Sequence, residues 1–382
     1  MKIAHICLNA YTDGWGYQEN LLSHYQMKEG HDVTIISSLT HLAPYLKEKE
    51  ILEIKSRGCE YTYNGVKTFR LKTSIHTTGL TVHNPRLFRT LCKVKPDIIF
   101  HHDCCPPSLF KVLFYKIFHP RTKIVVDNHA DIINQSPNKV WNFLYNMIFV
   151  RLSLKFISPF VIKYYGVTPA RCEYLKSPFG VPKKKISLLP IGADTDLVDS
   201  ITSSRAVQRA KYGYPIDGKI IVSGGKMGED KGTVTLLNAF KCLRRNDKTL
   251  SLVLFGNFSD TKTEALAKET DGVFVEGWCD RQKTIELLKL SDVACWPIHH
   301  TTLIEDAVAC ATPVVLRKTG NTIHSVDGNG ILIEHGNEDE LLTAITSILY
   351  DGIYAEFKNA ADIIKEKFGY HNISKQIIDD CK

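Results

Sequence analysis

The segment that says most about the architecture of this chain is Ile220-Ile221-Val222-Ser223-Gly224-Gly225-Lys226-Met227-Gly228-Glu229-Asp230-Lys231-Gly232. Its apolar beginning predicts a buried strand over Ile220–Ser223, and the apolar spacing after it predicts a helix over Val234–Leu243. A glycine-rich loop joins the two. A strand that passes through such a loop into a helix is typical of a doubly wound α/β sheet, where ligands bind at the carboxyl ends of the strands.

The two lysines of this loop, Lys226 and Lys231, predict an anion site. Their amino groups can converge on one diphosphate and neutralise the charge that a departing diphosphate gains. The loop is not a P-loop, because the pattern G-x-x-x-x-G-K-[ST] is absent. A solvated charged loop without a ligand is the alternative interpretation.

The alternation of short apolar strands and helical segments runs along the whole chain. Strands are predicted at Lys2–Leu8, His31–Ser37, Lys67–Leu71, Asp97–His101, Lys123–Asp127, Ile186–Leu189, Ser251–Phe255, Val273–Glu276, Val293–Trp296 and Pro313–Leu316. Such an order predicts two Rossmann-like, doubly wound α/β domains that face each other across a cleft. We expect them at residues 1–184 and 185–365, with a helix over about 366–382 that packs back on the first.

The composition fits a globular chain and excludes several other classes. Its 382 residues are 44% hydrophobic and 23% charged, which leaves no room for a mainly disordered or coiled-coil protein. The eleven cysteines form no C-x-x-C pair, so we expect a reducing, cytoplasmic location. The net charge of +7 does not favour one class of binding partner over another. The absence of a zinc-finger or RNP motif argues against nucleic acid as a partner. No leader or spanning segment is expected.

A second glycine loop, Asp13-Gly14-Trp15-Gly16, precedes a predicted helix at Gln18–Lys28. The two glycines would let backbone amides approach an anion. The third glycine of the dinucleotide fingerprint is replaced by Glu19, so no NAD cofactor is expected. A simple glycine turn at the strand-to-helix reversal is the alternative.

Taken in order, these segments resemble the retaining family-4 glycosyltransferases of the GT-B fold over nearly the whole chain. The pair Gly225-Lys226 and Lys231-Gly232 is similar to the Gly-Arg and Lys-Gly of the family's diphosphate clamp, with Lys in place of Arg at 226. Gly180–Asp194 resembles the entry into the second domain, and Ser291–Pro297 with Ala307–Val315 resembles the donor-binding segment.

This resemblance implies a metal-independent, retaining hexosyltransferase that uses a UDP- or GDP-sugar and no cofactor. A glycan or lipid-linked hydroxyl would be the acceptor, in surface polysaccharide biosynthesis. The backbone near Gly277 and Trp278 would contact the base, and the Gly16 amide would help to hold the diphosphate. Asp194-Thr195-Asp196 mimics a D-x-D metal motif, but it matches an ordinary turn of the resembled family.

The sequence departs from the family at a pair of glutamates separated by seven residues, of which the first contacts the sugar and the second the ribose. Glu305 or Asp306 matches the second, but Pro297 and Ile298 stand in place of the first. The run Thr302-Leu303-Ile304-Glu305 also predicts a capping box. In both interpretations the helix start at Thr301, Thr302 and Leu303 is expected to accept a phosphate.

His129, just after the strand Lys123–Asp127, is similar in position to the family's active-site histidine beside the donor sugar. Asp131 is placed to support its imidazole or an acceptor hydroxyl, and His102 is a weaker candidate for the acceptor side. A purely structural histidine is the alternative. The segment Phe143–Lys163 mixes apolar and basic residues, so it forms either a peripheral contact with the inner face of a membrane or a partly buried helix.

Two other functions remain open from the sequence. A non-catalytic relative that binds a nucleotide sugar or glycan is favoured by the missing glutamate and opposed by the lysine pair. A nucleotide-sugar epimerase would share the architecture, but it needs an acid/base pair that the sequence does not show clearly.

Overall fold

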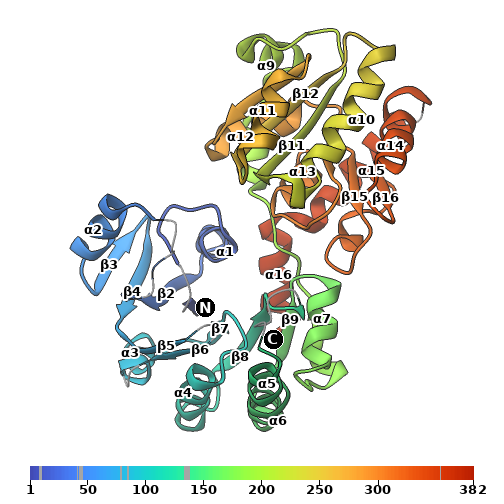
Figure 1. Ribbon diagram of the computed structural model, residues 1–382. Helices are drawn as coiled ribbons and strands as arrows, with labels where there is room; N and C mark the ends of the chain where they lie inside the picture. Colours follow the sequence, from blue (N-terminus) through green and yellow to red (C-terminus); the bar gives the residue numbers. More distant parts are fainter. Residues whose placement is uncertain are drawn as a thin grey trace. The chain divides into compact units, whose positions relative to one another are not determined.

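The computed structural model describes residues 1–7, 11–40, 42, 46–77, 80–83, 86–132, 138–352 and 354–382 (Figure 1). The chain divides into two compact units. The first comprises Met1–Pro190 with Ile373–Lys382, and the second comprises Ile191–Asn372. Each unit has its own sheet and its own buried core.

An eight-stranded sheet forms the centre of the first unit, in the order β10-β9-β8-β7-β1-β2-β4-β3. Every neighbouring pair is parallel except β3 and β4. Its strands are β1 (Lys2–Cys7), β2 (Asp32–Ser38), β3 (Glu60–Tyr63), β4 (Val66–Leu71), β7 (Ile98–His101), β8 (Lys123–Asn128), β9 (Lys163–Gly166) and β10 (Ile186–Leu188). Leu8, the predicted end of the first strand, lies outside the described residues.

Helices connect these strands. They are α1 (Gln18–Lys28), α2 (Glu48–Ser56), α3 (Arg86–Val94), α4 (Pro106–Phe118), α5 (Lys139–Asn142), a π-helical stretch η2 (Phe143–Val150), α6 (Arg151–Ile157), η3 (Ser158–Phe160), α7 (Pro169–Lys176) and η4 (Lys183–Lys185). A separate hairpin pairs β5 (Thr73–Thr77) with β6 (Leu80–His83). The inner sides of α4 and α6 bury Val112 and Leu154 in one core with the sheet residues Ile99 and Val126.

The strand Ile186–Leu188 belongs to the first sheet. The sequence had suggested instead that it is the first strand of the second domain. It pairs in parallel with β9, with Ile186 opposite Tyr164 and Leu188 opposite Gly166. Because α7 carries the chain from β9 to β10, the two strands form one crossover unit and lie side by side. The strand β9 itself was missed, since its four residues directly follow a long apolar helical stretch that obscured the Ser158-Pro159 turn between them.

The last helix, α16 (Tyr370–Asp380), contributes most of its length to the first unit. The Tyr165 hydroxyl donates to Asp380 Oδ2 at 2.7 Å, and the Ser374 hydroxyl donates to Glu29 Oε2 at 2.6 Å. Ile373 and Ile377 are buried. The C-terminal segment is therefore part of the first unit's structure.

The second unit holds a six-stranded, fully parallel sheet in the order β13-β12-β11-β14-β15-β16. Along β11, Ile220 and Val222 belong to one core, whereas Ile221 belongs to the core on the other face. Helices therefore cover both faces, as a parallel sheet requires. The strands are β11 (Ile220–Met227), β12 (Ser251–Phe258), β13 (Val273–Gly277), β14 (Val293–Trp296), β15 (Val314–Arg317) and β16 (Gly330–Ile333).

The helices of the second unit lie before, between and after its strands. They are α8 (Thr195–Ser200), α9 (Arg205–Tyr212), η5 (Glu229–Lys231), α10 (Thr233–Asn246), α11 (Thr261–Glu269), α12 (Arg281–Leu290), α13 (Leu303–Ala309), η6 (Ile323–Ser325), α14 (Glu338–Tyr350), α15 (Tyr354–Ile364) and η7 (Lys365–Phe368). Asp194 caps α8 by accepting a hydrogen bond from the Leu197 N–H at 3.2 Å, which gives the apparent D-x-D motif a structural role.

The glycine-rich segment of the second unit is mostly strand, which corrects the prediction of a loop after Ser223. β11 continues through Met227, with Gly225 opposite Gly256 and Lys226 opposite Asn257 of β12. A Cβ atom at Gly256 would lie 2.1 Å from the Gly225 carbonyl oxygen, so the two glycines allow the backbones to stay close. The loop proper is short and ends in η5.

Candidate functional site

A pocket of about 190 Å³ opens at the carboxyl ends of β11 and β14 in the second unit. Strand order reverses between these two neighbours, because β12 and β13 extend from one side of β11 and β14 begins the other side. Ligands of doubly wound sheets bind at such a switch point. The lining residues are Gly224, Lys226, Lys231, Trp296, His299, His300 and Thr301.

Both predicted clamp lysines line this pocket. Lys226 is exposed at the end of β11, and Lys231 lies in η5, where its amino group is 2.9 Å from Asp230 Oδ2. Burial, followed by the positive charge of Lys231, lowers the pKa of His299. A neutral imidazole beside two ammonium groups can donate a hydrogen bond to an anion without adding charge.

Glycine is required where the lysine loop turns back. Gly232 has a φ of +76°, and a Cβ atom there would lie 2.6 Å from Ile298 Cγ1. Gly225 has a φ of +103°, and its Cβ atom would lie 3.3 Å from Leu303 Cδ1. The structure therefore brings Gly225, Thr301 and Leu303 together beside the pocket. Their contact with a donor stays a prediction.

Glu305 does not act in a capping box, so that part of the prediction is wrong. Thr302 precedes α13 with backbone angles close to helical and makes no side-chain cap bond. The Glu305 carboxylate is fully buried and accepts a hydrogen bond from His300 Nε2 at 2.7 Å, with His324 Nε2 at 3.8 Å from the same oxygen. Its other oxygen, Oε2, is buried without a hydrogen-bond partner among the described residues.

The environment of Glu305 favours its charged form. Burial alone would raise the pKa of this carboxyl, but the neighbouring His300 and His324 lower it below its usual value. Because His300 also lines the pocket, Glu305 acts on the pocket through that imidazole. Sequence reasoning missed both histidines, although His300 lies only five residues before Glu305.

Asp306 forms a buried ion pair. Arg281 donates to its two carboxylate oxygens at 2.6 and 2.9 Å, and the Asp306 side chain is 3% exposed. This bidentate pair joins α12 to α13. Neither Glu305 nor Asp306 lines the pocket described above, so a direct ribose contact by either one stays a prediction.

In the first unit, His129 belongs to a buried hydrogen-bonded array at the carboxyl ends of β7 and β8. Asp127 Oδ2 accepts from His102 Nδ1 at 2.7 Å and from His129 Nε2 at 3.2 Å. His102 Nε2 lies 3.0 Å from His5 Nδ1, and His5 Nε2 lies 2.7 Å from Gln26 Oε1. His102 is therefore buried within the array, and His129 is its most accessible imidazole, with a 31% exposed side chain.

The histidine pKa values in this array shift in opposite directions, which determines which imidazole donates to which. Burial alone would lower the pKa of His102 and of His129, but the Asp127 carboxylate raises both above the usual value. Burial, assisted by His102, lowers the pKa of His5 to about 3. A cationic His102 then donates to the Nδ1 of a neutral His5, whose Nε2–H donates to Gln26.

The remaining predicted residues lie elsewhere. Asp131 is buried, and its carboxylate is 4.0 Å from Arg171 Nε, so the carboxylate beside His129 is Asp127. Gly277 ends β13 with a φ of +65°, and Trp278 after it is 72% exposed. Gly16 lies in the loop before α1, and it is Gly14 that needs a positive φ there.

Two clusters of side chains contain the atoms that metal ions prefer. They are His102, Asp127 and His129 in the first unit, and His300, Glu305 and His324 in the second. In each cluster the potential ligand atoms lie within 4.8 Å of one another. Hydrogen bonds from imidazole to carboxylate account for the first cluster and for His300 in the second without an ion. Metal independence stays a prediction that chelation can test.

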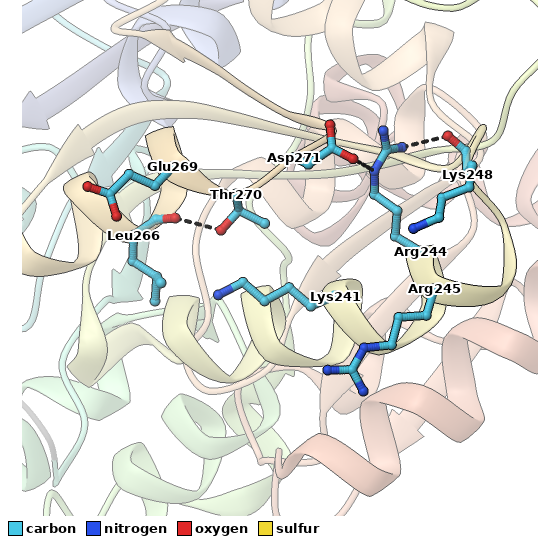
Figure 2. A pocket seen from close by; sticks show the side chains of 8 residues that line it. All are labelled: Lys241, Arg244, Arg245, Lys248, Leu266, Glu269, Thr270 and Asp271. Carbon is cyan, nitrogen blue, oxygen red and sulfur yellow. Dashed lines mark hydrogen bonds and ion pairs between the residues drawn. The ribbon is translucent and has the colours of Figure 1, made fainter.

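A larger hollow of about 320 Å³ lies between the ends of α10 and α11 (Figure 2). Arg244 donates to Asp271 Oδ2 at 2.9 Å and to the Lys248 carbonyl at 2.9 Å. These residues immediately precede β12 and β13, so the hollow lies at the amino ends of the strands. Although this hollow is the larger of the two, it is not a candidate donor site, because doubly wound sheets bind ligands at the carboxyl ends of their strands.

Comparison with solved structures defines the fold as GT-B. A glycosyltransferase from Rickettsia africae superposes with a TM-score of 0.71 at 17% identity, covering 100% of this chain and 97% of that one. The Anabaena protein Alr3699/HepE, solved in complex with UDP, superposes with a TM-score of 0.68 at 16% identity, covering 99% of both chains.

A family model matches part of the second unit. Residues 204–367 are similar to the family described as Glycosyl transferases group 1. A D-inositol 3-phosphate glycosyltransferase of Xylanimonas cellulosilytica is 26% identical over 230 residues, which cover 56% of this chain and 54% of that protein. The chain spans about half the length of the curated relatives that it matches.

Proposed function

We propose that this chain is a glycosyltransferase that moves a sugar from a nucleoside diphosphate sugar to a hydroxyl group. The observation that carries the proposal is the pocket with Lys226 and Lys231 at the switch point of the second sheet. This pocket lies inside the stretch that matches the group 1 family. Two cations and a neutral imidazole are suited to bind a diphosphate and to stabilise it as it leaves.

The finer assignments belong to the same proposal. The transferred sugar is a hexose carried by UDP or GDP, it keeps its anomeric configuration, and no metal takes part. The acceptor is a glycan or lipid-linked hydroxyl in surface polysaccharide biosynthesis, and the chain works in the cytoplasm in peripheral contact with a membrane. These assignments rest on the resemblance of the sequence motifs to retaining family-4 enzymes.

Each side chain has a role in this proposal. Lys226 and Lys231 hold the two phosphates, and His300, oriented by Glu305, contacts the same end of the donor. His129, whose pKa Asp127 raises, contacts the donor sugar. The backbone at Gly277 and Trp278 meets the base, and the Gly16 amide assists at the diphosphate.

The test uses the full chain in buffer with a chelator and a panel of UDP-, GDP- and ADP-hexoses. Release of nucleoside diphosphate is measured, because slow transfer to water reports on the site even without the natural acceptor. We expect release from one donor class, and a loss of about a hundredfold when Lys226→Ala and Lys231→Ala are combined. Lys262→Ala, an exposed lysine on α11, is the matched control and keeps the wild-type rate.

Other outcomes distinguish the alternatives. Tight binding of a nucleotide sugar with no release under any condition identifies a non-catalytic binding protein. Conversion of the donor into its epimer, visible in the proton spectrum of the sugar, identifies an epimerase. Unchanged turnover in the double lysine variant shows that the proposed clamp is wrong.

A further inference from the structure

The outward side of α4 is apolar although its inward side already fills the core. The inward side buries Leu109 and Val112 against the sheet. The positions that α4 exposes are nonetheless aromatic or aliphatic, and Phe114, Ile117 and Phe118 are 51%, 60% and 61% exposed. A helix with one buried face normally presents polar residues on the other face.

The same feature continues on the neighbouring helical stretch from α5 through η2 to α6. Leu154 and Ile157 are buried in the core, whereas Phe143, Leu152 and Phe156 are 56%, 61% and 63% exposed. The rings of Phe110 on α4 and Phe156 on α6 are 6.3 Å apart, so the two apolar sides adjoin (Figure 1). We call this surface, made by the exposed residues of Pro106–Phe118 and Lys139–Ile157, the α4–α6 face.

The charge around the α4–α6 face has a single sign. The two helical stretches of the face, Pro106–Phe118 and Lys139–Ile157, contain five Lys and Arg and no Asp or Glu. Lys139 and Lys155 are exposed on α5 and α6 themselves, among the apolar side chains.

These properties identify what would cover the face. An exposed apolar surface of this breadth marks an interaction site. A second copy of the same face would bring five positive charges against five with no acidic residue between them, which opposes self-association. Helices that combine an apolar side with lysine and arginine and lack acidic residues suit the interface of an anionic lipid bilayer.

We propose that the α4–α6 face inserts its apolar side chains into the headgroup region of an anionic bilayer, with the surrounding Lys and Arg on lipid phosphates. No helix of the described residues has both the length and the apolar character to cross a membrane. Binding to lipid is measured without donor or acceptor, so this inference and the proposed sugar transfer succeed or fail separately.

The test measures flotation of the full chain with two kinds of vesicle, phosphatidylcholine alone and phosphatidylcholine mixed with phosphatidylglycerol. We expect binding to the mixed vesicles only. Combining Ile117→Asp with Leu152→Asp should weaken this binding by about tenfold or more. The matched control combines Leu52→Asp with Val207→Asp, at positions 61% and 59% exposed outside the face, and should bind like wild type.

A second pair of variants tests the charge alone. Lys139→Glu combined with Lys155→Glu should weaken binding to the mixed vesicles by about tenfold or more, and Lys49→Glu combined with Lys72→Glu should not. Circular dichroism and light scattering in lipid-free buffer accompany each variant. Equal binding to both vesicle types, binding unchanged in the face variants, or a wild-type dimer that Ile117→Asp and Leu152→Asp dissolve would each overturn the proposal.

Discussion

Asp127 is the residue on which the chemistry of the first unit depends. Its carboxylate is fully buried and has two imidazole donors, and its Oδ1 also accepts from the Asp103 N–H at 2.9 Å. An isolated buried carboxylate would be costly, and the two imidazole donors offset that cost. Asp127 touches no expected ligand position directly, and it acts by positioning and charging His129.

Replacing Asp127 by Asn should remove the negative charge that raises the pKa values of His102 and His129. Without the carboxylate, burial dominates, and we expect the pKa of His129 to fall below its value in the wild type. The free energy of unfolding should fall by about 3 kcal/mol. Ring-proton shifts followed against pH measure the first effect, with Asp131→Asn as the control. A His129 pKa that is the same in Asp127→Asn and wild type would contradict the assignment.

The contribution of this array to stability should also depend on pH. The pKa values of His102 and His129 are raised on folding, so their stabilisation is complete below about pH 6.5 and is lost as pH rises through the raised values. The pKa of Asp127 is lowered, so its contribution is complete above about pH 4 and is lost as pH falls through the lowered value.

The difference in unfolding free energy between wild type and Asp127→Asn should therefore be greatest between about pH 4 and 6.5. It should shrink as the pH rises beyond the raised histidine pKa values. Denaturant titrations across this range measure it. A difference that stays constant into the alkaline range would show that the imidazoles are not charged in the folded protein.

Residue types near each other in sequence could be predicted as a site, but partners distant in sequence could not. Lys226 and Lys231 were found because the glycines around them lie within the same short segment. His5 and His102 are separated by 97 residues and meet only because β1 and β7 are neighbouring parallel strands. Histidines at the ends of several predicted strands were the available signal, since parallel strands end at one edge of the sheet.

At the level of elements, the start of α13 distinguishes two roles for Glu305. It either caps the helix with Thr302 or accepts a hydrogen bond from His300. Thr302 makes no cap bond, whereas Asn337, before α14, accepts from the Glu340 N–H at 3.0 Å. We expect Thr302→Ala to change the free energy of unfolding by less than about 0.5 kcal/mol, and Asn337→Ala to cost about 1 kcal/mol. Chemical denaturation of the second unit measures both. A loss at Thr302 as large as at Asn337 would restore the capping box.

Most of the parallel strands were predicted to within a few residues because continuous apolar runs identify them, whereas β9 and β16 were missed. β14 was predicted as Val293–Trp296, which is its observed extent. The antiparallel strand β3 was missed, because Glu60 and Thr62 are exposed and only Tyr61 and Tyr63 lie on its half-buried side. This alternation over four residues is too short to predict a strand by itself.

For the whole molecule, the return of the chain to the first unit through α16 joins segments that are far apart in the sequence. Removing residues 373–382 would delete the buried side chains Ile373, Ile377 and Ile378, each worth about 2 kcal/mol. We expect the unfolding free energy of the first unit to fall by about 5 kcal/mol or more. Calorimetry of the truncated chain measures this, and an unchanged first-unit transition would contradict the role of α16.

The most direct test of the central claim is calorimetric titration of UDP, GDP and ADP into the metal-free wild-type chain and the Lys226→Ala, Lys231→Ala variant. We predict that one of these diphosphates binds the wild type, that the double variant binds it about a hundredfold more weakly, and that Lys262→Ala binds it like wild type. Equal affinity of the wild type and the double variant, or no binding of any diphosphate to the wild type, would contradict a diphosphate site in the pocket of the second unit.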